Sequence, residues 1–148
     1  MRLFCQKFSP LLLVLTIACH DSTAPLTIPA QFELENINGR QLPTSYSTQG
    51  LTILSATLTL DNGRAALLVE RLQASGGIEF TFTSILSYSI DSDQIKITGL
   101  FEPCDPSANC ATTTRTGTIS NQTLSLLVAA FSIDGSIVYN YRIAATPR

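Results

Sequence analysis

Apolar and polar residues alternate along most of the chain, and a period of two is typical of strands with one buried face. From 54 to 60 and from 77 to 83, apolar residues alternate mainly with polar ones. We therefore expect half-buried strands of an antiparallel sheet. Their inner faces are predicted to carry Leu54, Ala56, Leu58 and Leu60 in one strand and Ile78, Phe80 and Phe82 in another.

Turn signals separate these runs. Short clusters rich in Asp, Asn, Ser and Gly favour the tight backbone conformations of hairpin turns, and they occur at 61–63, 91–93, 120–122 and 134–135. Two of the hairpins share one spacing, because Ile95 follows Ile90 by five residues and Leu124 follows Ile119 by five. This shared spacing predicts two hairpins of similar geometry.

One segment is ambiguous between helix and strand. Residues 65–72 have a helix-favouring composition, and Leu68 and Leu72 would lie on one helical face. The turn signal at 61–63 favours instead the return strand of a hairpin, and we predict a strand here. The predicted strands are then 31–37, 51–60, 64–73, 77–85, 86–91, 94–102, 111–120, 123–132 and 136–145.

These elements predict an all-β fold. Eight or nine antiparallel strands joined by short turns indicate an up-and-down meander, and closing the meander into a barrel removes its exposed edges. A two-sheet sandwich is the alternative arrangement of the same strands. The length of 148 residues suits one such domain, which we place at 31–148.

The N-terminal residues 1–18 have the features of an export signal. Arg2 and Lys7 give a positive start, and the apolar stretch 11–18 leads directly to Cys19. Eight residues of helix rise only about 12 Å, far less than the roughly 30 Å of a membrane's hydrocarbon layer. We therefore predict a secretory signal. Residues 19–30 are small, polar and proline-containing, which predicts a flexible tether.

The residues Leu-Thr-Ile-Ala-Cys at 15–19 resemble the lipobox of bacterial lipoproteins. The resemblance implies cleavage by a type II signal peptidase between Ala18 and Cys19, with diacylglycerol on the Cys19 thiol. It further implies a protein of the cell envelope, anchored to a membrane by acyl chains. Because His20 rather than Asp follows the cysteine, the outer membrane is favoured, with the domain facing the periplasm or the cell surface. An ordinary signal peptide cut nearby is the alternative.

Two further cysteines, Cys104 and Cys110, remain when Cys5 leaves with the signal and Cys19 carries lipid. In an exported, oxidising setting such an even pair predicts a disulfide. The turn-rich residues 105–109 can bring the two sulfurs together, and closing so short a loop contributes about 2 kcal/mol. A zinc site is the weaker alternative, because two cysteines without histidine make a poor ligand set.

Phe32 and Leu34 form an aromatic-x-Leu pattern in the first predicted strand, which runs into an Asn-Gly turn at 38–39 and a Leu-Pro pair at 42–43. In these features the body of the chain resembles small bacterial lipoproteins with a lipocalin-like β-barrel, a group with no established activity. The hairpin 86–97 resembles their recurrent strand-turn-strand unit. The chain has no Trp and so lacks the Gly-x-Trp signature of true lipocalins.

Composition and charge exclude several functions. A formal charge of -2 gives no basic field for nucleic acid. The only histidine, His20, lies on the tether, so a Ser-His-Asp triad is not possible. Glu70 and Glu79 could form a carboxylate pair, although solvated glutamates look the same in sequence. Asp91 and Asp93 begin a partial calcium-loop pattern, but a lysine stands at its required glycine position.

We therefore predict no catalytic residue, no metal site and no cofactor, and the sequence does not identify ligand-binding residues. Three tyrosines within the predicted strands, Tyr88, Tyr139 and Tyr141, are interpreted as cross-strand pairs. The expected function is that of a membrane-anchored envelope lipoprotein with a non-enzymatic binding or structural role. The alternative is a lipocalin-like carrier of a small apolar ligand, which requires an internal cavity of roughly 300 Å³ or more.

The lipid anchor can be tested at its attachment residue. Cys19→Ser removes the thiol that would receive diacylglycerol, so we expect loss of radiolabelled-palmitate incorporation and of membrane fractionation. Cys5→Ser is the matched control, because it changes a cysteine inside the signal and should leave both readouts intact. If Cys19→Ser is processed and fractionates as the wild type does, the chain is not a lipoprotein.

Overall fold

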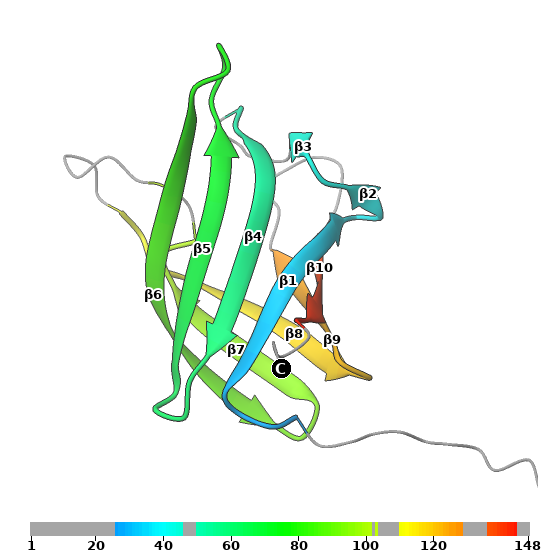
Figure 1. The fold of residues 1–148 in the computed structure, drawn as a ribbon. Helices are drawn as coiled ribbons and strands as arrows, with labels where there is room; N and C mark the ends of the chain where they lie inside the picture. Colours follow the sequence, from blue (N-terminus) through cyan, green and yellow to red (C-terminus); the bar gives the residue numbers. More distant parts are fainter. Residues whose placement is uncertain (1–25, 46–49, 102, 104–109, 129–135, 145–148) are drawn as a thin grey trace, which may run out of the picture.

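The computed structural model describes residues 26–45, 50–101, 103, 110–128 and 136–144, and these residues form one antiparallel sheet of ten strands. Eight of the strands close into a barrel in the order β1-β10-β9-β8-β7-β6-β5-β4, and β1 pairs with β4 to complete the ring (Figure 1). Strands β2 and β3 lie outside the ring. The ten strands are β1 (Ala30–Ile37), β2 (Arg40–Gln41), β3 (Thr44–Ser45), β4 (Thr52–Leu60), β5 (Ala65–Gln73), β6 (Glu79–Asp91), β7 (Gln94–Gly99), β8 (Thr113–Ser120), β9 (Thr123–Val128) and β10 (Ile137–Ile143).

The all-β meander and its closure into a barrel are confirmed. The ambiguous segment 65–72 is strand β5, because its alternate residues face the core and pair with β4 and β6. The division into strands 77–85 and 86–91 was wrong, since one continuous strand, β6, covers both. All regular elements among the described residues are strands, and this part of the chain contains no helix that could span a membrane.

A β-bulge corrects the predicted inner face of β4. Ile53 pairs with Leu72 and Ser55 pairs with Arg71, so Leu54 is the extra residue of the bulge. The inner face therefore passes from buried Ile53 to buried Ala56, and Leu54 is not part of it. The alternating pattern predicts an inward Leu54 because a period of two takes no account of an inserted residue.

The inner face predicted for 77–83 also needs correction. Ile78 precedes β6, follows two glycines with positive φ, and is 69% exposed. Phe80 pairs with buried Leu72 and so shares the inner side of the sheet, but it lies near the end of the strand and stays 37% exposed. Phe82 is half-buried against the core.

Tight turns join several of the strands as predicted. Ile90 pairs with Ile95 across a two-residue turn, and Ile119 pairs with Leu124 across another, so the two hairpins share register and turn length. Their turn conformations differ, because Ser92 is the one central residue of the first turn with positive φ. Both central residues of the second turn, Asn121 and Gln122, have positive φ. The turn predicted at 134–135 lies outside the described residues.

The two ends of the barrel differ. We name the end with the turns at 61–64, 92–93 and 121–122 the turn end, and β1 also begins there because Ala30 pairs with Leu60. At the opposite end, which we name the loop end, the described connection 74–78 joins β5 to β6, and β1, β7 and β9 end there while β4, β8 and β10 begin there. Between the ends, the interior is filled by side chains with less than 2% exposure: Phe32, Ile37, Leu58, Leu60, Leu68, Ile95, Ile97, Leu124, Leu126 and Tyr141.

Gly117 on β8 provides a test of this packing. A Cβ at this position would collide with the carbonyl oxygen of Ser125 and lie 2.8 Å from Leu126 Cδ2. Gly117→Ala should therefore lower the free energy of unfolding by about 1–3 kcal/mol in chemical denaturation. Gly63→Ala is the control, because its Cβ would meet its nearest neighbour at 3.4 Å. Equal stability of the two variants would contradict the close approach of β8 and β9.

Candidate functional site

Charged and aromatic side chains meet inside the barrel toward its loop end. Arg115 on β8 is 5% exposed, and its guanidinium carbon lies 4.0 Å from the centre of the Phe101 ring and 5.1 Å from that of Tyr139. Glu70 on β5 is buried as well. Two aromatic faces around a desolvated guanidinium give favourable cation–π contacts. We name Glu70, Phe101, Arg115, Tyr139 and Tyr141 the arginine cluster.

Strand register explains why these residues face inward. Arg115 pairs with buried Ile97, and its neighbours Thr114 and Thr116 are exposed on the outer wall. In a pleated strand the side chain between two outward ones must point inward. Tyr139 lies opposite Ile37 of β1 and Leu126 of β9, both of them buried.

Electrostatic coupling links the members of the arginine cluster. The pKa of the Tyr141 phenol is raised, first by its complete burial and then by the nearby Glu70 carboxylate, while Arg115 acts in the opposite direction. Tyr141 therefore stays neutral and able to donate a hydrogen bond at physiological pH. Every buried side-chain nitrogen and oxygen among the described residues has a hydrogen-bond partner. The cluster is thus a satisfied polar network within an apolar core.

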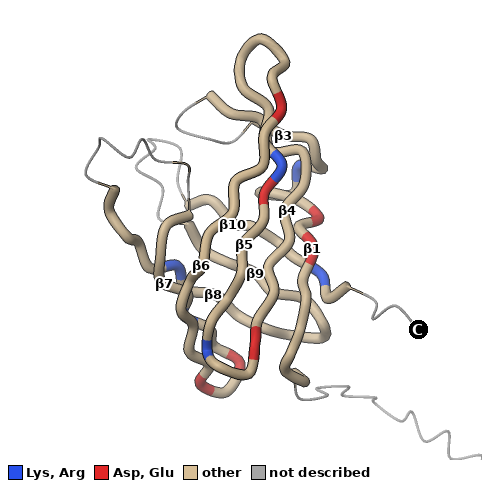
Figure 2. Tube along the Cα trace, turned by 60° about the vertical axis from the view of Figure 1, so that its left-hand side comes forward, with Lys and Arg blue, Asp and Glu red and all other residues tan. Residues whose placement is uncertain are grey.

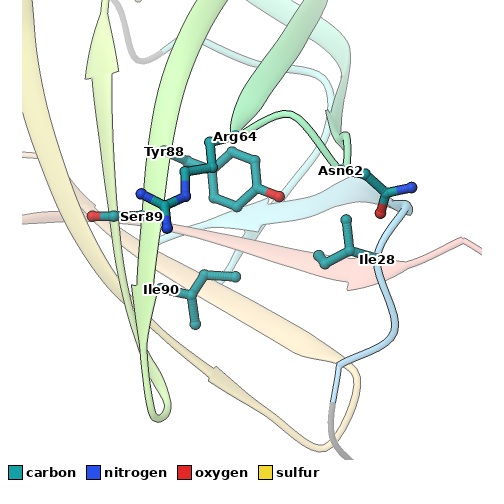
Figure 3. Close-up of a pocket in the computed structure, with 6 residues that line it drawn as sticks. All are labelled: Ile28, Asn62, Arg64, Tyr88, Ser89 and Ile90. Atoms are coloured by element: carbon teal, nitrogen blue, oxygen red, sulfur yellow. The ribbon is translucent and has the colours of Figure 1, made fainter.

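A pocket of about 400 Å³ lies at the turn end (Figure 3). Tyr88 and Ile90 of β6 face it from the inner side of the barrel, and Ile28 faces them from the segment that leads into β1. Asn62 and Arg64 of the β4–β5 turn stand at its rim. Ser89 completes the lining, and the six residues are Ile28, Asn62, Arg64, Tyr88, Ser89 and Ile90.

Hydrogen bonds fix the geometry of this pocket. Asp61 Oδ1 accepts from the backbone N–H groups of Gly63 and Ala65, each at 2.8 Å, which folds the Asp61 carboxylate into the turn. The Tyr88 hydroxyl donates to the Asp61 carbonyl oxygen, and the Tyr88 N–H donates to the Arg64 carbonyl oxygen at 2.9 Å. Burial and the Asp61 charge raise the pKa of Tyr88. Tyr88 of β6 therefore holds the turn at two points, Asp61 and Arg64.

The residues predicted as sites fall in different places. Cys19 and Cys104 lie outside the described residues, so the lipid attachment and the Cys104–Cys110 disulfide stay predictions; Cys110 is exposed before β8. Glu70 and Glu79 do not meet. Glu70 lies in the arginine cluster, whereas Glu79 is exposed and pairs with Arg71 at 2.9 Å.

Sequence reasoning missed both the arginine cluster and the pocket. Arg115 could have been found from its position between Thr114 and Thr116, since all three cannot face solvent from one strand. The tyrosines do lie opposite apolar residues of neighbouring strands, but they face inward, Tyr139 and Tyr141 in the cluster and Tyr88 in the pocket. The pocket had no sequence signal, because Ile28 reaches it from a region predicted to be a tether.

Metal chemistry has no support within the described ranges, which contain no group of three His, Cys, Asp or Glu residues able to hold an ion. Comparison with protein-family profiles, with curated proteins and with solved structures gives no match to this chain.

The coupling inside the arginine cluster can be measured by a double-mutant cycle. Arg115→Met and Glu70→Gln each leave the other charge in a buried site, so each should cost more alone than in combination. We expect a coupling energy of about 1–3 kcal/mol in equilibrium unfolding. The control cycle uses Arg71→Gln and Glu79→Gln, whose exposed ion pair should couple by less than about 1 kcal/mol. Additive effects of Arg115→Met and Glu70→Gln would show that the two charges do not interact.

Proposed function

We propose that this chain is a lipid-anchored envelope protein whose barrel is a non-enzymatic binding module, with the loop end as its binding surface. The observation that carries the proposal is the difference between the two ends of the barrel. Short turns and the beginning of β1 lie at one end, and the longer β5–β6 connection at 74–78 lies at the other. Loops held by a rigid sheet are the usual place for recognition in β-barrels.

The position of β1 gives this arrangement an orientation. Ala30 pairs with Leu60 at the turn end, and Ile28 packs against the core beside it. A lipid on Cys19 would therefore be joined to the barrel at the turn end. The loop end would point away from the membrane, toward the partners it could bind. The outer membrane is the proposed location, from the identity of His20 after Cys19.

Two apolar side chains support recognition at the loop end. Ile78 and Phe80 lie at the β5–β6 connection, where they are 69% and 37% exposed. Exposed apolar residues on a polar barrel are candidates for contact with a protein partner. The arginine cluster lies inside the barrel toward this end, and its Glu70 is on β5, the strand that leads into this connection.

The filled interior favours a binding surface over a carrier. Ten side chains with almost no exposure occupy the described part of the barrel core, and a carrier would need space there. The buried titratable groups belong to a satisfied network, and we assign no catalytic role to them. A carrier that encloses its ligand at the centre of the barrel is therefore the less supported function, whereas the pocket of about 400 Å³ lies at the turn end, outside this filled core.

Site-specific photo-cross-linking in the native envelope tests the loop end. A photoreactive phenylalanine analogue at position 78 should give a discrete cross-linked product. The same analogue at position 85 is the control, because Ile85 is 79% exposed but lies on the outer wall away from the loops. Identical products at both positions, or a product only at position 85, would rule out the loop end as the binding surface.

A further inference from the structure

The turn-end pocket has an apolar side that matches an alkyl chain. Ile28 and Ile90 face each other across it, and the Tyr88 ring stands behind them (Figure 3). Ile90 retains 38% exposure although it lies on the inner side of β6 and pairs with buried Ile95. An apolar ligand against Ile28 and Ile90 would remove this surface from water.

One cation stands at the rim of the pocket. In Figure 3 the Arg64 guanidinium lies near Tyr88 and Ser89, at the edge of the space lined by Ile90. Within the described residues no carboxylate forms an ion pair with Arg64, and the two ion pairs present are elsewhere on the barrel. The Asp61 carboxylate, in the same turn, is held by two backbone N–H groups. Arg64 is thus available to bind an anionic group.

The lining of the pocket supplies one positive charge, that of Arg64. Asp61, Asp91 and Asp93 lie in the turns at this end of the barrel (Figure 2). A multiply charged group such as phosphate would be neutralised only in part by Arg64, because no second lining residue carries a positive charge. A monocarboxylate needs one cation, and a guanidinium can bind it through two parallel hydrogen bonds.

We propose that the turn-end pocket binds a monoanionic amphiphile, a carboxylate that carries a short alkyl chain. The carboxylate binds Arg64, and the alkyl chain packs between Ile28 and Ile90. The pocket volume of about 400 Å³ suits a small ligand. The hydrogen bonds of Tyr88 to the turn organise the pocket in advance, which lowers the cost of binding. This inference is independent of the lipid anchor and of the loop end.

Calorimetric titration of the purified full-length chain with octanoate tests the site. Cys19→Ser is carried throughout, so that no acyl chain of the protein itself can compete. Octanoate is expected to bind at least about tenfold more tightly than acetate, which lacks the chain, or octyltrimethylammonium, which has the opposite charge. No binding of octanoate, or equal binding of octyltrimethylammonium, would overturn the proposal.

Variants locate the binding on the barrel. Arg64→Gln should weaken octanoate binding about three- to tenfold, since the guanidinium is partly solvated, while Arg64→Lys, which keeps the charge but loses the paired hydrogen bonds, should weaken it less. Arg40→Gln is the matched control, because Arg40 is an exposed arginine of β2 at the loop end. Circular dichroism checks that each variant is folded. An unchanged affinity in a folded Arg64→Gln variant would also overturn the proposal.

Discussion

The pairing of β1 on both of its edges is the constraint on which the barrel depends. One edge binds β10 and the other binds β4, so the first and last described strands of the ring meet in one continuous sheet. Phe32 shows the result, since it lies opposite Leu58 on one side and Ile143 on the other and has no exposed surface. Without this closure, β4 and β10 would each present a row of unpaired backbone groups to solvent. The separation into a turn end and a loop end also follows from the closed ring.

Most of the fold could be predicted from the sequence, because hydrophobic alternation and turn chemistry act locally. The hairpin with Ile90 and Ile95 and that with Ile119 and Leu124 needed only the spacing of apolar residues around a polar turn. Two predictions about the strands were wrong because the pattern of apolar residues does not report an inserted residue or the length of a strand's pairing. The bulge at Leu54 inserts one residue without changing composition, and the continuity of β6 depends on its long pairing with β5 rather than on its own residues.

The sites were much less predictable, because each depends on residues distant in sequence. A charged residue such as Arg115 is assigned to the surface by default, and only the register of β8 against β7 and β9 shows that it faces Tyr139. Similarly, the pocket joins Ile28, Arg64 and Ile90 from three separate parts of the chain. Alternation therefore establishes which face of a strand is buried, but barrel closure decides which side chains meet inside.

The double pairing of β1 has a consequence for the order of events in folding. During synthesis from the N- to the C-terminus, β1 can pair with β4 once about twenty further residues have been made. Its second partner, β10, is made only after every other strand of the ring. Until then the sheet has two open edges that could pair with another molecule. A chain that completes its ring last therefore keeps these edges exposed until synthesis has reached β10.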